Sequence, residues 1–151
     1  RDALVDTGRE AELGTDLIIG FSFYIAETRE KAIEEAKLFF EENMKMFAPL
    51  GFVRDLTEDQ IAALGDRRRA PTTKLPTLEE AVETGSWLCG PAELIIEELM
   101  KIQALYPGLE EVNVGQTVGT PQSVILEQME RFAEEVMPAF NDKETYSATI
   151  D

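Results

Sequence analysis

Three apolar stretches that fit buried β-strands, each followed by an amphipathic helix, constrain this chain more than any other feature. The first covers residues 17–26, where bulky, aromatic and β-branched side chains alternate and only Ser22 is polar. A strand that is apolar at nearly every position is typical of a parallel sheet covered on both faces. We therefore predict a central parallel strand here. Thr28 can cap the helix that follows, in which apolar residues recur at helical spacing from Ala32 to Phe47.

Two further strand and helix units follow in the second half of the chain. Residues 86–89 form a short apolar run before a helix that carries Ile95 and Leu99. Residues 109–118 supply a third strand, and the helix after it must end near Pro138, which cannot continue a helix. Alternating strands and helices predict parallel strands joined by right-handed crossovers.

Three such units cannot close a barrel, and their sheet would leave two open edges and one uncovered apolar face. We therefore expect an α/β fold that is the C-terminal part of a (β/α)8 TIM barrel, with about three parallel βα units and a long loop insertion. The alternative is that the chain covers its edges by self-association. Residues 1–140 would form this segment and residues 141–151 a polar tail. The chain opens at Arg1, within what looks like a helix end over residues 2–8, so we expect it to be cut from a longer protein.

The insertion covers residues 49–85 and contains two expected short helices, each with a capping box. The boxes pair Thr57 with Gln60 and Thr77 with Glu80. From its composition, we expect the polar stretch between them, residues 65–76, to be the most mobile segment. It gathers four of the chain's 14 basic residues, which are Arg67, Arg68, Arg69 and Lys74.

The composition of the chain argues against several kinds of partner and binding site. The net charge is -16, from 14 basic and 30 acidic residues, so nucleic acid and anionic membranes are not expected partners. The chain has no histidine, which removes the usual general base and the commonest metal ligand, and we expect no metal site. The single Cys89 fits a buried position in a cytoplasmic protein. The longest apolar stretch has about half the length of a membrane-spanning helix.

Three local motifs, in the same order, resemble the bacterial luciferase-like, flavin-dependent monooxygenases. The first joins strand to helix over residues 23–32, with the sequence FYIAETREKA, and the second is the turn LCGPAELI over residues 88–95. The third is the closing segment, with VGTPQ at residues 118–122 and FAEEVMP at residues 132–138. Thr120 can cap that last helix. In the second motif Cys89 and Gly90 stand where the family has glycine and then serine or threonine, so a side-chain cap is missing there.

The resemblance implies a barrel enzyme that uses reduced flavin and dioxygen to oxidise a small organic substrate. It implies FMN, or a deazaflavin, in a full-length parent, and no cofactor bound to this segment alone, because most flavin contacts come from earlier strands. The fragment alone would be inactive. It also implies a homodimer. The competing hypothesis is a non-enzymatic acidic α/β interaction or oligomerisation module that lacks a flavin site.

By this resemblance, three groups of residues are candidates for the flavin and substrate pocket. One face of the first strand carries Gly20, Ser22 and Tyr24, which could equally be core packing. The end of the last strand carries Asn113, Gln116 and Thr117, which could equally hold the loop together by hydrogen bonds. The insertion takes the place of the family's active-site loop, so Arg67, Arg68, Arg69 or Lys74 could approach an anionic flavin or substrate. The alternative for these four is a solvated charged loop, and no catalytic residue is identified.

Overall fold

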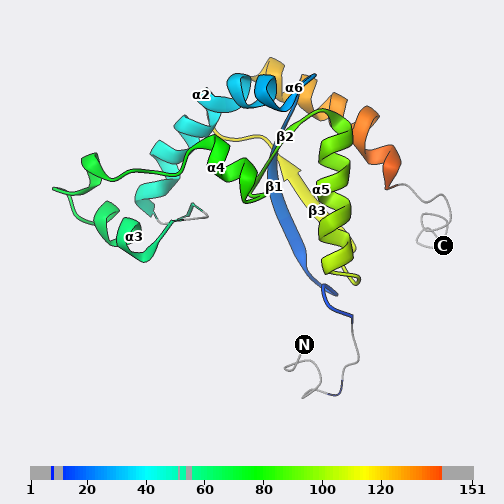
Figure 1. Ribbon diagram of the computed structural model, residues 1–151, viewed down its shortest axis with the longest axis horizontal. Helices are drawn as coiled ribbons and strands as arrows, with labels where there is room; N and C mark the ends of the chain where they lie inside the picture. Colours follow the sequence, from blue (N-terminus) through cyan, green and yellow to red (C-terminus); the bar gives the residue numbers. More distant parts are fainter. Residues whose placement is uncertain (1–7, 9–11, 51, 54–55, 141–151) are drawn as a thin grey trace.

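The computed structural model describes residues 8, 12–50, 52–53 and 56–140 of the 151-residue chain. They form a three-stranded parallel sheet with helices against both faces (Figure 1). The expected helix end over residues 2–8 lies almost wholly outside the described residues, and the expected tail at 141–151 does so entirely.

The sheet consists of β1 (Ile18–Ile25), β2 (Trp87–Gly90) and β3 (Glu111–Gly115), in the order β2-β1-β3. All pairings are parallel, with Ser22 opposite both Trp87 and Gly115. The predicted central parallel strand is confirmed. The strand order differs from the chain order, because the connection after β2 carries the chain across β1 to its other side.

The crossover from β1 to β2 and the crossover from β2 to β3 run in opposite directions along the sheet. Because right-handed crossovers are the rule, their helices lie on opposite faces. The first crossover contains α2 (Arg29–Phe47), and the second contains α5 (Ala92–Leu105). The Thr28 hydroxyl accepts a hydrogen bond from the Lys31 N–H at 3.1 Å, so the predicted cap of α2 is confirmed. α5 begins at Pro91 with no side-chain cap, as expected from the sequence of that turn.

The insertion after α2 contains four short helical segments. These are η1 (Ala48–Leu50), α3 (Glu58–Leu64), η2 (Ala70–Thr72) and α4 (Leu78–Glu83). Both predicted capping boxes are present, with Thr57 and Gln60 on α3 and Thr77 and Glu80 on α4. In Figure 1, α4 lies near the sheet whereas α3 lies at the far end of the insertion.

The closing helix departs from the prediction at both ends. α6 (Gln122–Arg131) has Pro121 as its N-cap, and no side chain caps it. Thr120 is buried, and its hydroxyl lies 3.4 Å from that of Thr117, so the expected cap is wrong. Beyond α6 the chain widens into a π-helical turn, η3 (Phe132–Val136), and ends in the 3-10 turn η4 (Met137–Ala139). Pro138 has no N–H and its ring crowds the preceding turn, which accounts for this change of helix type.

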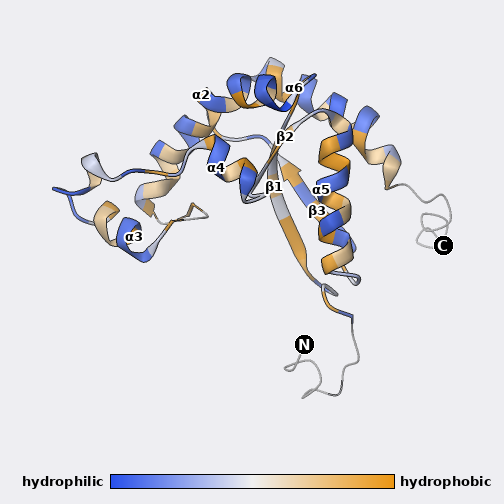
Figure 2. Ribbon diagram, viewed as in Figure 1, coloured by the Kyte–Doolittle hydropathy of each residue, from blue (hydrophilic) through white to orange (hydrophobic). Residues whose placement is uncertain are grey.

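Two cores form, one on each side of the sheet. One joins α2 and α4 to the even-numbered side chains of β1, such as Tyr24, and contains Trp87 and Cys89. The other joins α5 and η3 to the odd-numbered side chains, such as Phe23 and Ile25. Figure 2 shows much of β1 and α5 in the colours of apolar residues. The α/β class with parallel strands and a long insertion is confirmed, and it is consistent with part of a TIM-barrel-like fold.

Candidate functional site

One face of the sheet carries small and polar side chains side by side. Gly20 and Ser22 of β1 pair with Asn113 and Gly115 of β3. Because side chains alternate along a strand, these four residues point to the same side, toward α2 and α4. The opposite side of β3 carries Val112 and Val114, as the sequence predicted, and both pack against the core below α5. β3 therefore presents valines on one face and small or polar residues on the other, and Gly20 and Ser22 continue the second face on β1.

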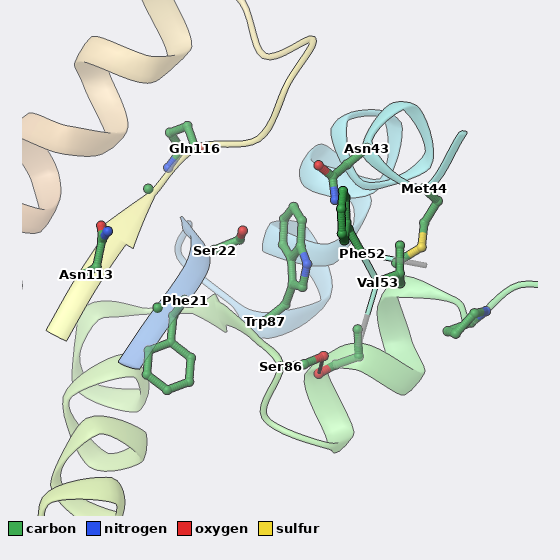
Figure 3. Close-up of a pocket in the computed structure, with 14 residues that line it drawn as sticks. Phe21, Ser22, Asn43, Met44, Phe52, Val53, Ser86, Trp87, Asn113 and Gln116 are labelled. Atoms are coloured by element: carbon green, nitrogen blue, oxygen red, sulfur yellow. Dashed lines mark hydrogen bonds between the residues drawn. The ribbon is translucent and has the colours of Figure 1, made fainter. Parts of the chain in front are cut away.

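A cleft of about 320 Å³ opens on this small polar face (Figure 3). This is at the lower end of the range that small-molecule sites occupy. Its lining comes from all three strands, α2 and the insertion. The members are Gly20, Phe21, Ser22, Asn43, Met44, Phe52, Val53, Pro76, Ala81, Ser86, Trp87, Asn113, Gly115 and Gln116.

Trp87 forms the floor of the cleft on the β2 side. Its ring is buried and meets the Phe40 ring edge to face, with 5.3 Å between ring centroids. Phe52 is 76% exposed and lies across the cleft near Asn43 (Figure 3). A buried indole with an exposed aromatic ring opposite it suits a flat, partly apolar molecule.

The polar atoms of the cleft are uncharged. Amides come from Asn43, Asn113 and Gln116, and hydroxyls come from Ser22 and Ser86. Two of these groups are partly engaged, since Gln116 Nε2 donates to the Phe23 carbonyl at 3.1 Å and the Ser86 hydroxyl donates to the Ala81 carbonyl at 3.1 Å. No lysine, arginine, aspartate or glutamate is among the lining residues that the structure describes. These described side chains can thus hydrogen-bond a neutral polar ring, but none of them offers an ion pair to a phosphate.

Four of the six predicted pocket residues meet in this cleft, and they are Gly20, Ser22, Asn113 and Gln116. Tyr24 shares their face but does not line the cleft. It is buried against Phe39, with ring centroids 6.3 Å apart. Burial, followed by the neighbouring carboxylates of Glu35 and Glu127, raises the pKa of Tyr24 to about 12. Tyr24 is therefore a neutral core residue, which is the alternative that the sequence left open.

Thr117 also lies outside the cleft lining. Its hydroxyl pairs with that of Thr120 within the loop between β3 and α6, and the Thr120 N–H donates to the Thr117 carbonyl at 3.2 Å. These contacts fit the second interpretation of Thr117, in which its hydrogen bonds hold the loop.

The four basic residues of the insertion are not among the cleft lining either. Arg67, Arg68 and Arg69 belong to the turn before η2, where the Asp66 carboxylate accepts the Arg68 N–H at 2.8 Å. Lys74 Nζ lies 3.6 Å from a Glu80 carboxylate oxygen. In this conformation the four cations agree with a solvated loop, and their approach to a bound anion stays a prediction.

Sequence reasoning missed Asn43, Phe52, Ser86 and Trp87. Strand alternation could have identified Trp87. Trp87 and Cys89 lie on the same face of their short strand, and Trp87 pairs with Ser22, so its side chain lies on the Ser22 face of the sheet. Asn43 interrupts the charged face of α2 with an uncharged amide, and its position opposite β3 depends on the packing of the helix. Phe52 follows no periodic pattern, so nothing local could place it at the cleft.

Two further properties concern the described part of the chain. It contains no cluster of three or more histidine, cysteine, aspartate or glutamate side chains arranged to hold a metal ion. None of its helices combines the length and the apolar character needed to span a bilayer.

Comparison with known proteins gives a structural result only. The sequence matches no family model and no curated protein. The fold is similar to monooxygenase RslO1 from Streptomyces bottropensis, with a TM-score of 0.59 and 17% identity over 93% of this chain and 36% of that one. It is also similar to the oxygenating constituent of 3,6-diketocamphane monooxygenase from the CAM plasmid of Pseudomonas putida. That protein is a type II Baeyer-Villiger monooxygenase, solved in complex with FMN, with a TM-score of 0.57 and 14% identity over 91% of this chain and 37% of that one.

At these identities the similarity shows a shared fold and not a shared activity. The chain spans a little over a third of the length of each of these two structures.

Proposed function

We propose that this chain is the C-terminal part of a flavin-dependent monooxygenase of the luciferase-like type, and that the cleft beside Trp87 receives part of its flavin. The parent would use reduced flavin and dioxygen to oxidise a small organic substrate. The main support is the small polar face of the sheet. In most buried sheets large apolar side chains fill the space above the strands, whereas here Gly20, Ser22, Asn113 and Gly115 leave a cleft in which a ligand can lie. The fold similarity to two monooxygenases agrees with it.

The described residues fit the ring of a flavin and not its phosphate. Amides at Asn113 and Gln116 can pair with the polar edge of a flat heterocycle, and Trp87 supplies an apolar surface beneath it. No cation is among the cleft residues within the described ranges, so among those residues nothing pairs with a phosphate. When bound, the reduced flavin would supply the electrons for dioxygen, while these side chains orient the ring and keep water from it.

Trp87 allows a direct test, since it is the only tryptophan in the chain and lies in the cleft. Its indole N–H gives one signal in a nitrogen-15 correlation spectrum. We expect FMN and riboflavin to shift this signal saturably, with weak affinity of about millimolar Kd, because the segment supplies only part of a site. The two ligands should bind about equally well, because none of the lining residues that the structure describes is a cation that could recognise the phosphate of FMN.

A matched pair of variants shows whether the shift arises in the cleft. A Cβ at Gly115 would meet no atom within 4 Å, so Gly115→Leu adds a side chain to the open space without displacing the backbone. It should weaken binding about tenfold, a difference of roughly 1.4 kcal/mol. Gly65→Leu adds the same group at an exposed turn after α3 and should change nothing. No saturable shift with either ligand, or equal binding by both variants, would favour the non-enzymatic module instead.

A further inference from the structure

A hydrogen bond within the protein fixes the direction of the Gln116 amide at the cleft beside Trp87. Gln116 Nε2 donates to the backbone carbonyl of Phe23 at 3.1 Å. Because a carbonyl oxygen only accepts, the nitrogen of the amide must lie on the Phe23 side. One N–H of the amide is used in this way, whereas no described residue donates to its Oε1. Gln116 lines the cleft, so an acceptor oxygen and one further N–H are left for a ligand.

Ser86 is constrained on the other side of β1. It lies directly before β2, whereas Gln116 follows β3, and these two strands flank β1. The Ser86 hydroxyl donates to the Ala81 carbonyl at 3.1 Å, and the Thr84 hydroxyl lies 3.4 Å from Ser86 Oγ as a donor. The proton of the Ser86 hydroxyl is therefore used within the protein, and Ser86 presents only an acceptor to the cleft.

These two groups differ in the kind of ring edge that they can satisfy. An edge that carries carbonyl groups needs donors, and Ser86 has no proton to give it. Gln116 still has an N–H and an acceptor oxygen within one planar amide, so it matches an edge on which an acceptor and a donor are neighbours. A cyclic imide has such an edge, because its N–H lies between two carbonyl groups. The Gln116 side of the cleft therefore favours an imide edge, and the Ser86 side does not.

We propose that Gln116 determines how a ring lies in the cleft, by pairing with the imide edge of a flat heterocycle. The imide N–H donates to Gln116 Oε1, and one adjacent carbonyl accepts from the remaining N–H of Nε2. The inference rests on the function proposed above and adds the orientation of the flavin. Oxidised flavin has a single ring N–H, at N3, between the carbonyls at C2 and C4. The N3 edge thus lies against Gln116.

FMN and its N3-methyl derivative test this pairing with the chain as it is. The methyl group removes the N–H and leaves both neighbouring carbonyls in place. The indole signal of Trp87 gives the affinity of each compound. A second readout is the carbon-13 signal of the Gln116 side-chain carbonyl, because that carbon responds when its oxygen accepts a hydrogen bond.

We expect FMN to shift both signals. N3-methyl FMN should bind about tenfold more weakly and leave the Gln116 carbon signal in place. Gln116→Met keeps the length of the side chain but removes both of its polar atoms, so this variant should bind the two compounds equally. Gln122→Met makes the same change at an exposed position of α6 and should keep the tenfold preference for FMN.

The outcomes separate this inference from the function on which it rests. If FMN binds and N3-methyl FMN binds equally well, the cleft receives flavin but the pairing is wrong. A tenfold preference that persists in Gln116→Met would mean that the methyl group is excluded by its size, which also overturns the pairing. Should Gln116→Met fail to fold, the carbon signal in the original chain decides, since no shift on FMN binding contradicts the pairing. If neither compound shifts the Trp87 signal, the proposed function fails and the pairing fails with it.

Discussion

The side-chain amide of Gln128 forms hydrogen bonds with both the backbone N–H and the backbone carbonyl of Ile25. The Ile25 N–H donates to Gln128 Oε1 at 2.6 Å, and Gln128 Nε2 donates to the Ile25 carbonyl at 3.2 Å. Arg131 Nη1 adds a third hydrogen bond to that carbonyl at 2.8 Å. β3 stops at Gly115, opposite Ser22, so Ile25 lies beyond its reach. The amide therefore replaces a strand where the sheet is incomplete, and it fixes α6 to the end of β1.

Replacing Gln128 with leucine should destabilise the fold. The substitution keeps a similar volume but leaves the buried N–H of Ile25 with no acceptor, which costs about 1–3 kcal/mol. Urea unfolding followed by circular dichroism gives the change in free energy. Gln122→Leu is the control, because Gln122 lies exposed in the same helix, and it should stay within about 0.5 kcal/mol of the original chain. Equal losses in the two variants would show that the Ile25 contacts do not stabilise the fold.

The two capping boxes should differ in importance, although they have the same chemistry. Thr77 caps α4, whose Leu78 and Ala81 are buried in the core beside α2, so Thr77→Ala should lower the free energy of unfolding by about 1 kcal/mol. Thr57 caps α3, whose principal contacts are with η1 and η2 and not with the sheet. Thr57→Ala should leave global unfolding unchanged and speed amide exchange within α3 only. A global loss from Thr57→Ala would mean that α3 is part of the cooperative unit.

Cys89 should be unreactive in the folded chain. Its side chain is 1% exposed, and burial raises the pKa of the thiol from 9.0 to about 12, while Arg29 nearby acts weakly in the other direction. At pH 8 a disulfide reagent should therefore react at least about a hundredfold more slowly with the native chain than with the chain in urea. Rapid stoichiometric reaction of the native protein would contradict this.

The same shift predicts a loss of stability in alkali. Since the pKa of Cys89 is higher in the folded state, its contribution is fully present below about pH 9 and is lost as the pH rises toward 12. Tyr24, whose pKa is also raised to about 12, contributes in the same direction above its ordinary value of 10.0. The free energy of unfolding should thus fall between pH 9 and 12, and Cys89→Ala should make that fall shallower. An unchanged slope in the variant would exclude Cys89 as a source.

Local chemistry made much of this fold predictable. Alternation along β3 correctly separated Val112 and Val114 from Asn113 and Gly115, because side chains of a strand alternate whatever the strand packs against. The Thr28 cap and both capping boxes were also correct, since a cap depends on residues only three positions apart. Alternation along β1 also placed Gly20 and Ser22 on one face, and only the family resemblance made that face a candidate for a pocket.

Features that depend on distant contacts were not predictable in this way. The order β2-β1-β3 depends on which edge of β1 the third strand joins, and no residue in β3 encodes that choice locally. Phe52 reaches the cleft only because the insertion folds back over α2, and Gln128 is buried by its hydrogen bonds to Ile25, which lies 103 positions away in the sequence. Tyr24 had the same strand face as Ser22, but helix packing over the end of β1 buried it.

Two glycines should respond differently to alanine. Gly90 has φ +145°, a backbone conformation that L-residues rarely adopt, and a Cβ there would lie 2.9 Å from Leu94 Cδ2. Gly90→Ala should therefore cost about 1–3 kcal/mol in thermal or urea unfolding. At Gly20 a Cβ would meet only the Asn113 carbonyl oxygen at 3.8 Å, an ordinary contact, so Gly20→Ala should change stability by less than about 0.5 kcal/mol. Packing alone does not require glycine at position 20. If Gly20→Ala leaves stability unchanged but reduces the FMN-dependent shift of the Trp87 signal, the open space above Gly20 is where the ligand binds. A large loss of stability would instead mean that Gly20 is required for packing of the core.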